Sequence, residues 1–268
     1  MKERLVVSVS GGRSSMYMAH RLFHEYGDQY EMKFLFANTG QELEETLVFV
    51  YQCETIHMLP VTWVEAVVDP EKGKGTRHKI VDFHTASRNG EPFEAMISKY
   101  GIPNIARPRC TKELKIFPIN SYKRDIGWKG VQQAIGIRAD EPRRYAKRKP
   151  KMVYPLVDFF PVTKQDVINW WSKQPFDLQL QEHEGNCSWC YKKSLSKLKR
   201  LMHERPAIFD FPERMEEKYG LVRAKQGTPI KFFRGNRSVA DLRVLSAQDD
   251  EVVLDDIMNE CGESCEAI

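Results

Sequence analysis

The residues most able to do chemistry in this 268-residue chain are cysteines. Cys187 and Cys190 form a Cys-x-x-Cys pair, a spacing that brings two thiols close enough to bind one metal centre. The chain holds six cysteines but is too long and too charged, at 29%, to resemble a small disulfide-bonded secreted protein. The pattern favours a metal or redox role in a reducing compartment, with a ligand-free pair as the alternative. Cys53, in an apolar helical pattern, is expected to be a small core residue.

A second group of such residues lies near the N-terminus, where an apolar stretch at residues 5–9 runs into Ser-Gly-Gly-Arg-Ser-Ser at residues 10–15. A helical pattern follows at once. The N-terminus of a helix exposes unpaired N–H groups and a partial positive charge, and glycines let the backbone approach an anion closely. The spacing fits neither a Walker loop nor a dinucleotide fingerprint. We therefore predict a phosphate cradle of another kind, with a tight turn capped by serine as the alternative.

Basic residues are unevenly placed in a chain whose formal net charge is only +4. Residues 138–151 carry seven Lys and Arg side chains, and a second basic group follows the Cys-x-x-Cys pair at positions 192–205. The end of the chain is acidic, with no Lys or Arg after Arg243. A solvated surface is one interpretation of these runs, and an anion site for phosphate, sulfate or nucleic acid is the other.

Apolar stretches alternate with helical patterns in the first half of the chain. We expect strands at residues 5–9, 34–37, 61–64 and 131–137, and helices at 14–25, 42–53, 111–124 and 163–171. Pro118 should kink or shorten the third helix, and Thr163 should cap the fourth. Alternation of this kind predicts an α/β fold, a doubly wound and mostly parallel sheet with helices on both faces. We expect residues 1–160 to form the α/β core, 161–245 a mainly helical cysteine-containing region, and 246–268 an acidic tail.

Several motifs follow one another along the chain. The glycine loop is followed by Asn-Thr-Gly at residues 38–40, Glu-Thr at 45–46, and Arg-Cys-Thr-x-Glu-Leu-Lys at 109–115. Then come Gly-Ile-Arg at 136–138 with two arginines at 143–144, Tyr-Pro-Leu at 154–156, and Gly-Asn-Cys-x-x-Cys at 185–190. As an ordered set over roughly residues 5–195, these motifs resemble the phosphoadenosine phosphosulfate (PAPS) reductase and PP-loop ATP pyrophosphatase family. They look closest to the PAPS-reductase-like proteins often carried by phages and prophages.

The resemblance implies an adenine nucleotide alpha hydrolase-like fold with a nucleotide site at the glycine loop. It implies these nucleotide-binding residues: Ser10, Gly11, Gly12, Arg13, Ser14, Ser15, Asn38, Thr39, Gly40, Gly136 and Arg138. The chain departs from the family pattern at Ser14 and Asn38, where the family has aspartates, and at Arg109, where it has a cysteine. The departures leave phosphate binding in place and put the role of the missing aspartates in question.

The resemblance also implies that Cys110 joins Cys187 and Cys190 around one metal centre. Three thiolates on a [4Fe–4S] cluster leave one iron open to a sulfur atom or a substrate. Cys261 or Cys265 is a candidate fourth ligand, and zinc bound by cysteines is the alternative metal.

The leading functional expectation is an enzyme that uses ATP and Mg²⁺ to adenylate a substrate and then transfers sulfur to it through the cysteines. Arg13 and Arg138 would stabilise charge, and nucleic acid would be the sulfur acceptor. The first alternative is a PAPS reductase that releases sulfite, with Cys261 as the catalytic thiol and a thioredoxin-like reductant. The second is a non-catalytic protein that binds a nucleotide or nucleic acid. We expect a cytoplasmic protein, a homodimer, with no membrane partner.

Overall fold

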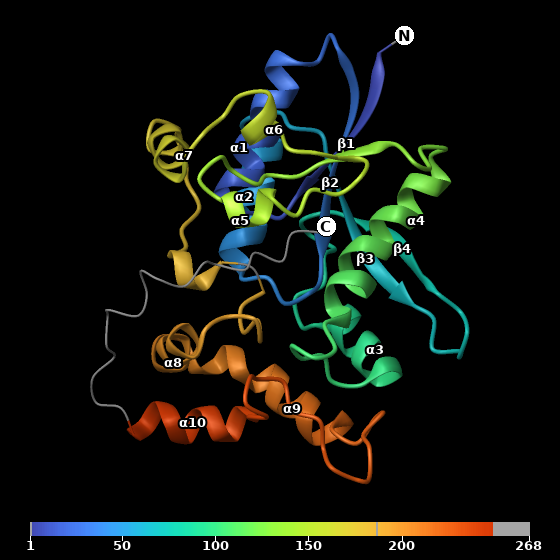
Figure 1. The fold of residues 1–268 in the computed structure, drawn as a ribbon, viewed down its shortest axis with the longest axis vertical. Coiled ribbons are helices and arrows are strands. Elements are labelled where there is room, and N and C mark those ends of the chain that lie inside the picture. The colour runs from blue at the N-terminus through green and yellow to red at the C-terminus, as the bar shows by residue number, and fades with distance from the viewer. Residues whose placement is uncertain (1, 186, 249–268) are drawn as a thin grey trace.

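A six-stranded sheet forms the centre of the structure, a computed structural model that describes residues 2–185 and 187–248 (Figure 1). The strand order is β4-β3-β2-β1-β5-β6, and only the β3–β4 pair is antiparallel. The predicted α/β fold with a mostly parallel sheet is therefore confirmed. The strands are β1 (Glu3–Val9), β2 (Tyr30–Asn38), β3 (Val61–Val68), β4 (Thr76–Val81), β5 (Gln132–Ala134) and β6 (Met152–Val153).

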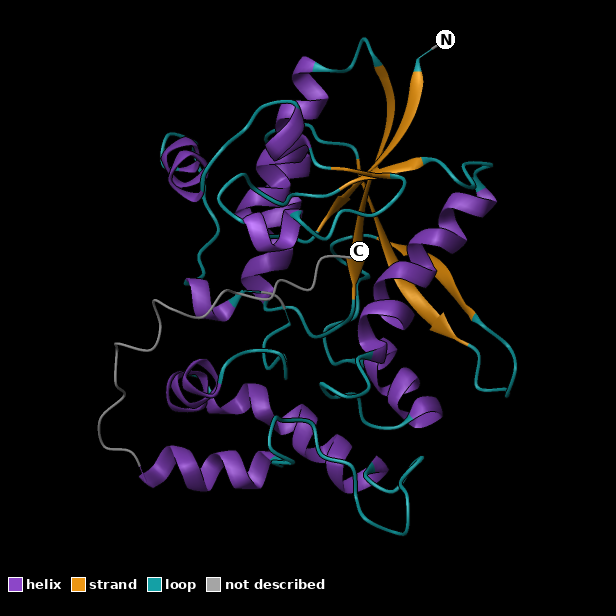
Figure 2. Ribbon diagram, in the orientation of Figure 1, coloured by secondary structure: helices purple, strands orange, loops and turns teal. Residues whose placement is uncertain are grey.

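Helices cover both faces of the sheet (Figure 2). Along β1, Leu5 and Val7 pack in the cluster that holds α1 and α2, whereas Val6 packs against α4 on the other face. A central strand buried on both faces needs a continuous apolar run, which is why residues 5–9 predicted a strand without alternation. The α-helices are α1 (Arg13–Glu25), α2 (Glu44–Thr55), α3 (Glu91–Tyr100), α4 (Phe117–Asp125), α5 (Pro142–Tyr145), α6 (Pro155–Asp158), α7 (Lys164–Trp171), α8 (Leu195–Glu204), α9 (Asp210–Tyr219) and α10 (Val239–Gln248).

Two local expectations about helices can be compared directly with the structure. Thr163 caps α7, as predicted: Asp166 N donates to Thr163 Oγ1 at 3.3 Å, and Thr163 N donates back to the Asp166 carboxylate at 2.8 Å. The helix expected at residues 111–124 begins as a π-helix, Thr111–Ile116, and continues as α4 with Pro118 in its first turn. Pro118 therefore marks the change between the two helix types. It does not end the helix, because proline is tolerated in the first turn of an α-helix.

The structure also differs from the expected elements. The strand expected at residues 131–137 is shorter in the structure, where β5 spans only Gln132–Ala134, so Gly136 and Arg138 lie in the segment after it. The sequence analysis missed β4 and α3 altogether. β4 is a sheet edge in which polar and apolar residues do not alternate cleanly.

Two large apolar clusters divide the described residues. The first joins β1, α1 and α2, and extends through α7 to Leu178 and Leu180. The second joins α3 and the π-helix to α8, α9 and α10, which lie together at the lower end of the molecule (Figure 1). Residues 164–180 therefore pack with the first cluster, because α7 packs on α1, whereas β3 and α3 contribute to the second cluster together with the helices after residue 194.

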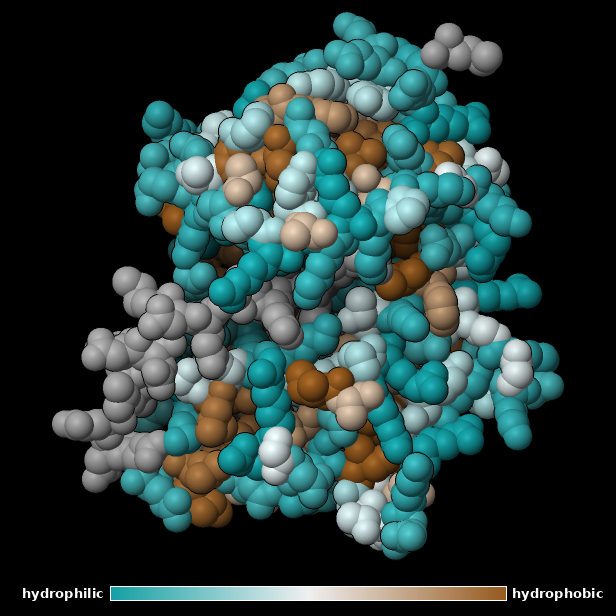
Figure 3. Space-filling model, in the orientation of Figure 1, coloured by the Kyte–Doolittle hydropathy of each residue, from teal (hydrophilic) through white to brown (hydrophobic). Residues whose placement is uncertain are grey.

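The surface seen in Figure 3 is mostly hydrophilic, with apolar side chains in its upper part and in its lower part, where α8 and α10 lie. Val244 of α10 is 57% exposed. Among the described helices, none combines the length and the apolar character needed to cross a lipid bilayer.

Candidate functional site

The glycine loop connects β1 to α1 at the carboxyl end of the central strand. Gly11 has φ +77°, and a Cβ at this position would lie 2.4 Å from Thr46 Cγ2 of α2. Only glycine fits this conformation and this close approach. Gly12 is the N-cap of α1 and has no side chain to accept from the N–H groups of the first turn. The loop therefore has the backbone features that anion binding at a helix N-terminus needs.

The serines of the loop have different roles. Ser15 Oγ accepts from Ser10 N at 3.1 Å and donates to Gly12 O at 2.9 Å, so it holds the turn together from inside. Ser10 Oγ lies 3.1 Å from Ser15 Oγ. Ser14 is half-buried, and its Oγ accepts from Arg138 Nη1 at 3.0 Å. The residue that replaces the family aspartate is therefore in contact with the predicted arginine.

Arg138 reaches Ser14 because the segment after β5 passes close to α1. A Cβ on Gly136 would lie 2.9 Å from Ser15 Cα, so this crossing of two backbones needs a glycine. The Arg138 guanidinium also donates to Asp140 Oδ1 at 2.9 Å, and Arg138 N donates to Glu141 Oε2 at 3.0 Å. The sequence analysis brought Arg138 to the loop correctly and missed both carboxylates beside it.

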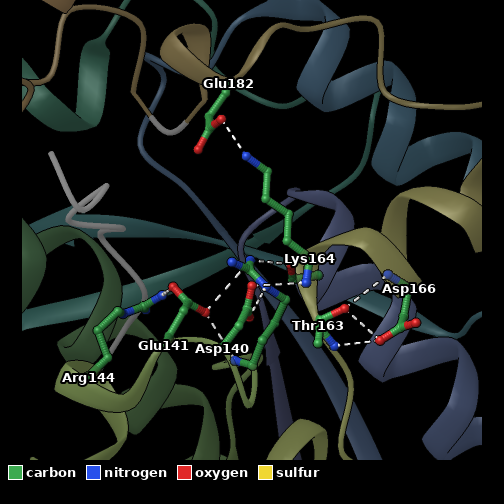
Figure 4. Close-up of polar contacts among 9 residues, drawn as sticks. Asp140, Glu141, Arg144, Thr163, Lys164, Asp166 and Glu182 are labelled. Atoms are coloured by element: carbon green, nitrogen blue, oxygen red, sulfur yellow. Dashed lines mark hydrogen bonds and ion pairs between the residues drawn. The ribbon is translucent and has the colours of Figure 1, made fainter. Parts of the chain in front are cut away.

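Figure 4 shows how these carboxylates connect to further cations. Glu141 Oε1 lies 2.5 Å from Arg144 Nη1, and Asp140 Oδ2 accepts from Lys164 N at 3.0 Å. The side chain of Lys164 extends to Glu182 at 2.5 Å. The pKa of Glu182 lies below its ordinary value, mainly because of this hydrogen bond and further because of nearby positive charge. From Arg138 outward, one branch runs through Glu141 to Arg144, and the other runs through Asp140 to the backbone N–H of Lys164.

Arg13 is not directed toward the glycine loop. Its Nε and Nη2 donate to the two carboxylate oxygens of Asp177 at 2.7 and 3.0 Å. Its Nη1 donates to Leu180 O at 3.3 Å, and Nη2 also donates to Leu178 O. The side chain of Arg13, which was predicted to bind nucleotide and to act in catalysis, therefore binds another part of the chain in this structure.

The side chain of Asn38 is also bound to other groups of the protein. It is fully buried, and its Nδ2 donates to Glu65 Oε1 at 2.6 Å and to Ser87 O at 2.9 Å. Its Oδ1 accepts from Gly40 N at 3.2 Å. Both the amide nitrogen and the amide oxygen of Asn38 form hydrogen bonds within the protein. In this structure Asn38 therefore holds the end of β2 and does not offer its side chain to a ligand.

The predicted cysteines converge at the carboxyl end of β2. Cys110, Cys187 and Cys190 line one narrow cavity together with Thr39, Phe93, Thr111, Lys115, Trp189 and Tyr191. Thr39 Oγ1 lies 3.6 Å from Cys187 Sγ, and Tyr191 Oη lies 3.1 Å from Cys110 Sγ. Trp189 is buried, and its Nε1 donates to Gln41 Oε1 at 2.5 Å, which fastens the cysteine pair to the segment after β2.

Within residues 2–185 and 187–248, no three His, Cys, Asp or Glu side chains are arranged to coordinate a metal ion. The three cysteines thus share a cavity without forming a coordination sphere. Cys53 is fully buried in the first apolar cluster, as expected, and burial raises the pKa of its thiol. Cys261 and Cys265 lie outside the described residues.

The sequence analysis missed a buried charge pair at this cavity. The Glu42 carboxylate accepts from Thr39 N at 2.8 Å and from Thr39 Oγ1 at 2.9 Å, and lies 3.9 Å from Cys187 Sγ. Lys115 Nζ lies 4.0 Å from Glu42 Oε1, and both side chains are less than one-tenth exposed. The Thr-x-x-Glu spacing of Thr39 and Glu42 is the capping-box signature, and it could have revealed the contact between these two residues from the sequence.

The π-helix presents Lys115 and Thr111 to the cavity. Its wider turn buries three consecutive side chains, Glu113, Leu114 and Lys115. Among the described residues, Thr111 Oγ1 is a buried hydroxyl without a hydrogen-bond partner. Short π-helical turns occur frequently at functional sites. The cavity therefore combines thiols, a buried cation and a hydroxyl with unused bonding capacity.

These features define an α/β protein whose candidate site lies where the carboxyl ends of β1, β2 and β5 meet, the edge at which such sheets bind ligands. The chain is 36% identical over 197 residues to an uncharacterized nin region protein, ORF290, of Escherichia phage lambda. The aligned part covers 72% of this chain and 67% of the phage protein. The chain therefore belongs to the family of this phage lambda protein. No protein-family model matches the chain.

Proposed function

We propose that the protein is a nucleotide-dependent enzyme of the PAPS reductase and PP-loop ATP pyrophosphatase type, which adenylates a substrate and then transfers sulfur to it. One observation carries the proposal. Thr39, at the end of β2 beside the glycine loop, lines the cavity of Cys110, Cys187 and Cys190. A phosphate cradle and a thiol cavity at one edge of one sheet suit a reaction that joins nucleotide chemistry to sulfur chemistry.

In the proposed reaction a substrate oxygen attacks the α-phosphorus of Mg²⁺-bound ATP, and pyrophosphate leaves. A sulfur nucleophile then attacks the activated carbon, and AMP leaves with the oxygen. The chain contributes positioning and charge stabilisation. The N–H groups of the first turn of α1 would hold phosphate oxygens, and Arg138, next to Ser14, would stabilise developing negative charge. Arg13 has no such role here, because its donors are bound to residues 177–180.

The donor set of the cavity suits a thiophilic metal group. Soft thiolates favour an iron–sulfur cluster or zinc, and three cysteines from two segments would leave one coordination position open. Cys110, Cys187 and Cys190 would hold the group, and the group would supply a site that binds sulfur. Trp189 and Phe93 would keep water away from it, since both are buried.

The basic residues suit a nucleic acid as the sulfur acceptor. Arg143, Lys147 and Lys149 are exposed beyond Arg138. Exposed cations near a reactive edge position a phosphate backbone without reading its sequence. The phage relative supports an origin in a phage or prophage.

Exchange of labelled pyrophosphate into ATP tests the adenylation step. We expect exchange that depends on Mg²⁺ and on total cellular RNA as acceptor. Arg138→Gln should lower it about 100-fold, the size of effect seen when one transition-state donor is removed. Arg4→Gln, which breaks an exposed ion pair with Glu31, is the matched control and should leave exchange unchanged. Absence of exchange, together with thioredoxin-dependent sulfite release from PAPS, would replace this proposal with the reductase alternative.

A further inference from the structure

The contacts of Arg13 link two parts of the candidate site that are far apart in sequence. Arg13 is the first residue of α1, directly after the glycine loop, and Asp177 is 164 positions away. The guanidinium forms a two-point contact with the Asp177 carboxylate and also binds the carbonyls of Leu178 and Leu180. Trp171 Nε1 donates to the carbonyl of Arg13 itself at 3.0 Å. The first turn of α1 and residues 171–180 are thereby held together.

The segment that Arg13 holds leads directly to the cysteine pair. Residues 177–185 have little regular structure apart from one 3₁₀ turn, Glu182–Glu184, before Cys187. The far side of this segment is fixed to the helical region, because Gln181 Oε1 accepts from Arg200 Nη2 at 2.9 Å and His183 Nε2 lies 2.7 Å from Glu204 Oε2. Lys193 Nζ donates to the carbonyls of His183 and Gly185 at 2.8 and 2.6 Å. On the loop side, Arg13 holds this same segment together with Leu178 and Leu180, whose side chains pack in the first apolar cluster.

We propose that Arg13 is a positioning residue that couples the glycine loop to the cysteine pair. It holds residues 177–180 against the first turn of α1, so a ligand seated on that turn changes the exposure of Cys187 and Cys190. This inference rests on the proposed function for the identity of the ligand, but the positioning of the cysteines by Arg13 does not depend on the ligand.

Charge and geometry explain why arginine is needed at this position. A bidentate contact with a carboxylate plus two carbonyl contacts uses the fork of donors that arginine has and lysine lacks. The Arg13 and Asp177 side chains are about 30% exposed, at 29% and 32%, so water screens the pair only in part. A ligand phosphate on the first turn of α1 would bind next to the backbone of Arg13, the residue whose side chain holds Asp177. By linkage, a change at the cysteines must in turn change the affinity of the loop for that ligand.

Alkylation by iodoacetamide, followed residue by residue by mass spectrometry, tests the coupling in the full chain. Cys110 is the comparison residue: it lies at the start of the π-helix, outside residues 177–185, and its Sγ contacts Tyr191 Oη at 3.1 Å. Arg13→Gln and Asp177→Asn should each speed labelling of Cys187 and Cys190 about tenfold and leave Cys110 nearly unchanged, as expected for local opening. Arg13→Lys should give an intermediate rate. The variant with both substitutions, Arg13→Gln and Asp177→Asn, should show the same labelling rate as either single variant, because each substitution removes the same interaction.

Addition of Mg·ATP separates the two proposals. In the wild type it should change labelling of Cys187 and Cys190, and in Arg13→Gln it should not. Arg4→Gln should behave as wild type in every arm. Unchanged labelling in Arg13→Gln and Asp177→Asn, with both variants folded by circular dichroism, would overturn the inference. Faster labelling in the variants with no effect of Mg·ATP on the wild type would keep the positioning role and overturn nucleotide binding instead.

Discussion

Thr39 Oγ1 and Cys187 Sγ lie 3.6 Å apart although 148 positions separate the two residues. Thr39 follows β2 beside the glycine loop, whereas Cys187 belongs to the segment that leads into the helical region. Ser188 N also donates to Gln41 O at 2.9 Å, so this contact is supported by the backbone. The proposed reaction, which combines nucleotide chemistry with sulfur chemistry, depends on this contact between the two segments.

Gly11→Ala should destabilise the protein by about 3 kcal/mol, because the new Cβ meets Thr46 in a conformation that favours glycine. Gly73→Ala is the matched control: Gly73 has φ +91° with nothing within 4 Å, so only backbone strain of about 1 kcal/mol is expected. Urea unfolding at pH 7.5 measures both. Equal losses in the two variants would show that the approach of Gly11 to Thr46 has no energetic importance.

Glu42→Ala should cost about 2–3 kcal/mol, because it leaves the buried N–H of Thr39 without an acceptor and Lys115 without its nearby charge. Glu42→Gln keeps an acceptor oxygen and should cost less. Glu44→Ala removes the exposed pair with Arg88 and should cost at most about 0.5 kcal/mol. Thermal unfolding ranks the three, and an order in which Glu44→Ala is the worst contradicts the buried network.

Acid should destabilise the protein through His20. Burial, with the nearby charges of His24 and His57, lowers the pKa of His20 from 6.5 to about 4. The unfolded chain therefore takes up a proton at higher pH than the folded chain. The contribution of His20 to stability is complete above about pH 6.5 and is lost as the pH falls toward 4.

His20→Phe keeps a ring against Trp170 and removes the titration. The loss of stability between pH 7 and pH 4.5 should shrink by about 1–2 kcal/mol in this variant, after allowance for the solvent around a half-buried group. His203→Gln, at an exposed position of α8, is the control and should keep the wild-type pH dependence. A His20→Phe profile parallel to that of the wild type would contradict the prediction.

The sequence predicted β1, β2, β3, β5 and the loop because their signals are local. Residues 5–9 form one apolar run, and the glycines that follow permit a turn that other residues resist. The sequence did not predict β4, because an edge strand such as Thr76–Val81 is exposed on much of its surface and lacks a clear pattern. The π-helix was also missed, since its wider turn depends on what its side chains pack against.

The protein partners of Arg13 and Asn38 were not predicted, for a related reason. Residue type and position in a motif suggested ligand contacts for both. Their actual partners, Asp177 and Glu65, lie 164 and 27 positions away, and only the folded chain brings them together. Cys110, Cys187 and Cys190 were placed together correctly because the resemblance to the PAPS reductase family implied that the two motifs that hold them share one centre.

The absorbance spectrum and metal content of the anaerobically purified protein test the central claim most directly. We predict a brown protein that bleaches on reduction and contains iron and inorganic sulfide. The colour should be lost in Cys110→Ser, Cys187→Ser and Cys190→Ser and kept in Cys53→Ala, whose cysteine is buried in the other cluster. A colourless protein with stoichiometric zinc would keep the metal site and remove sulfur delivery by a cluster. A protein without bound metal, unchanged by all three cavity substitutions, would contradict the account.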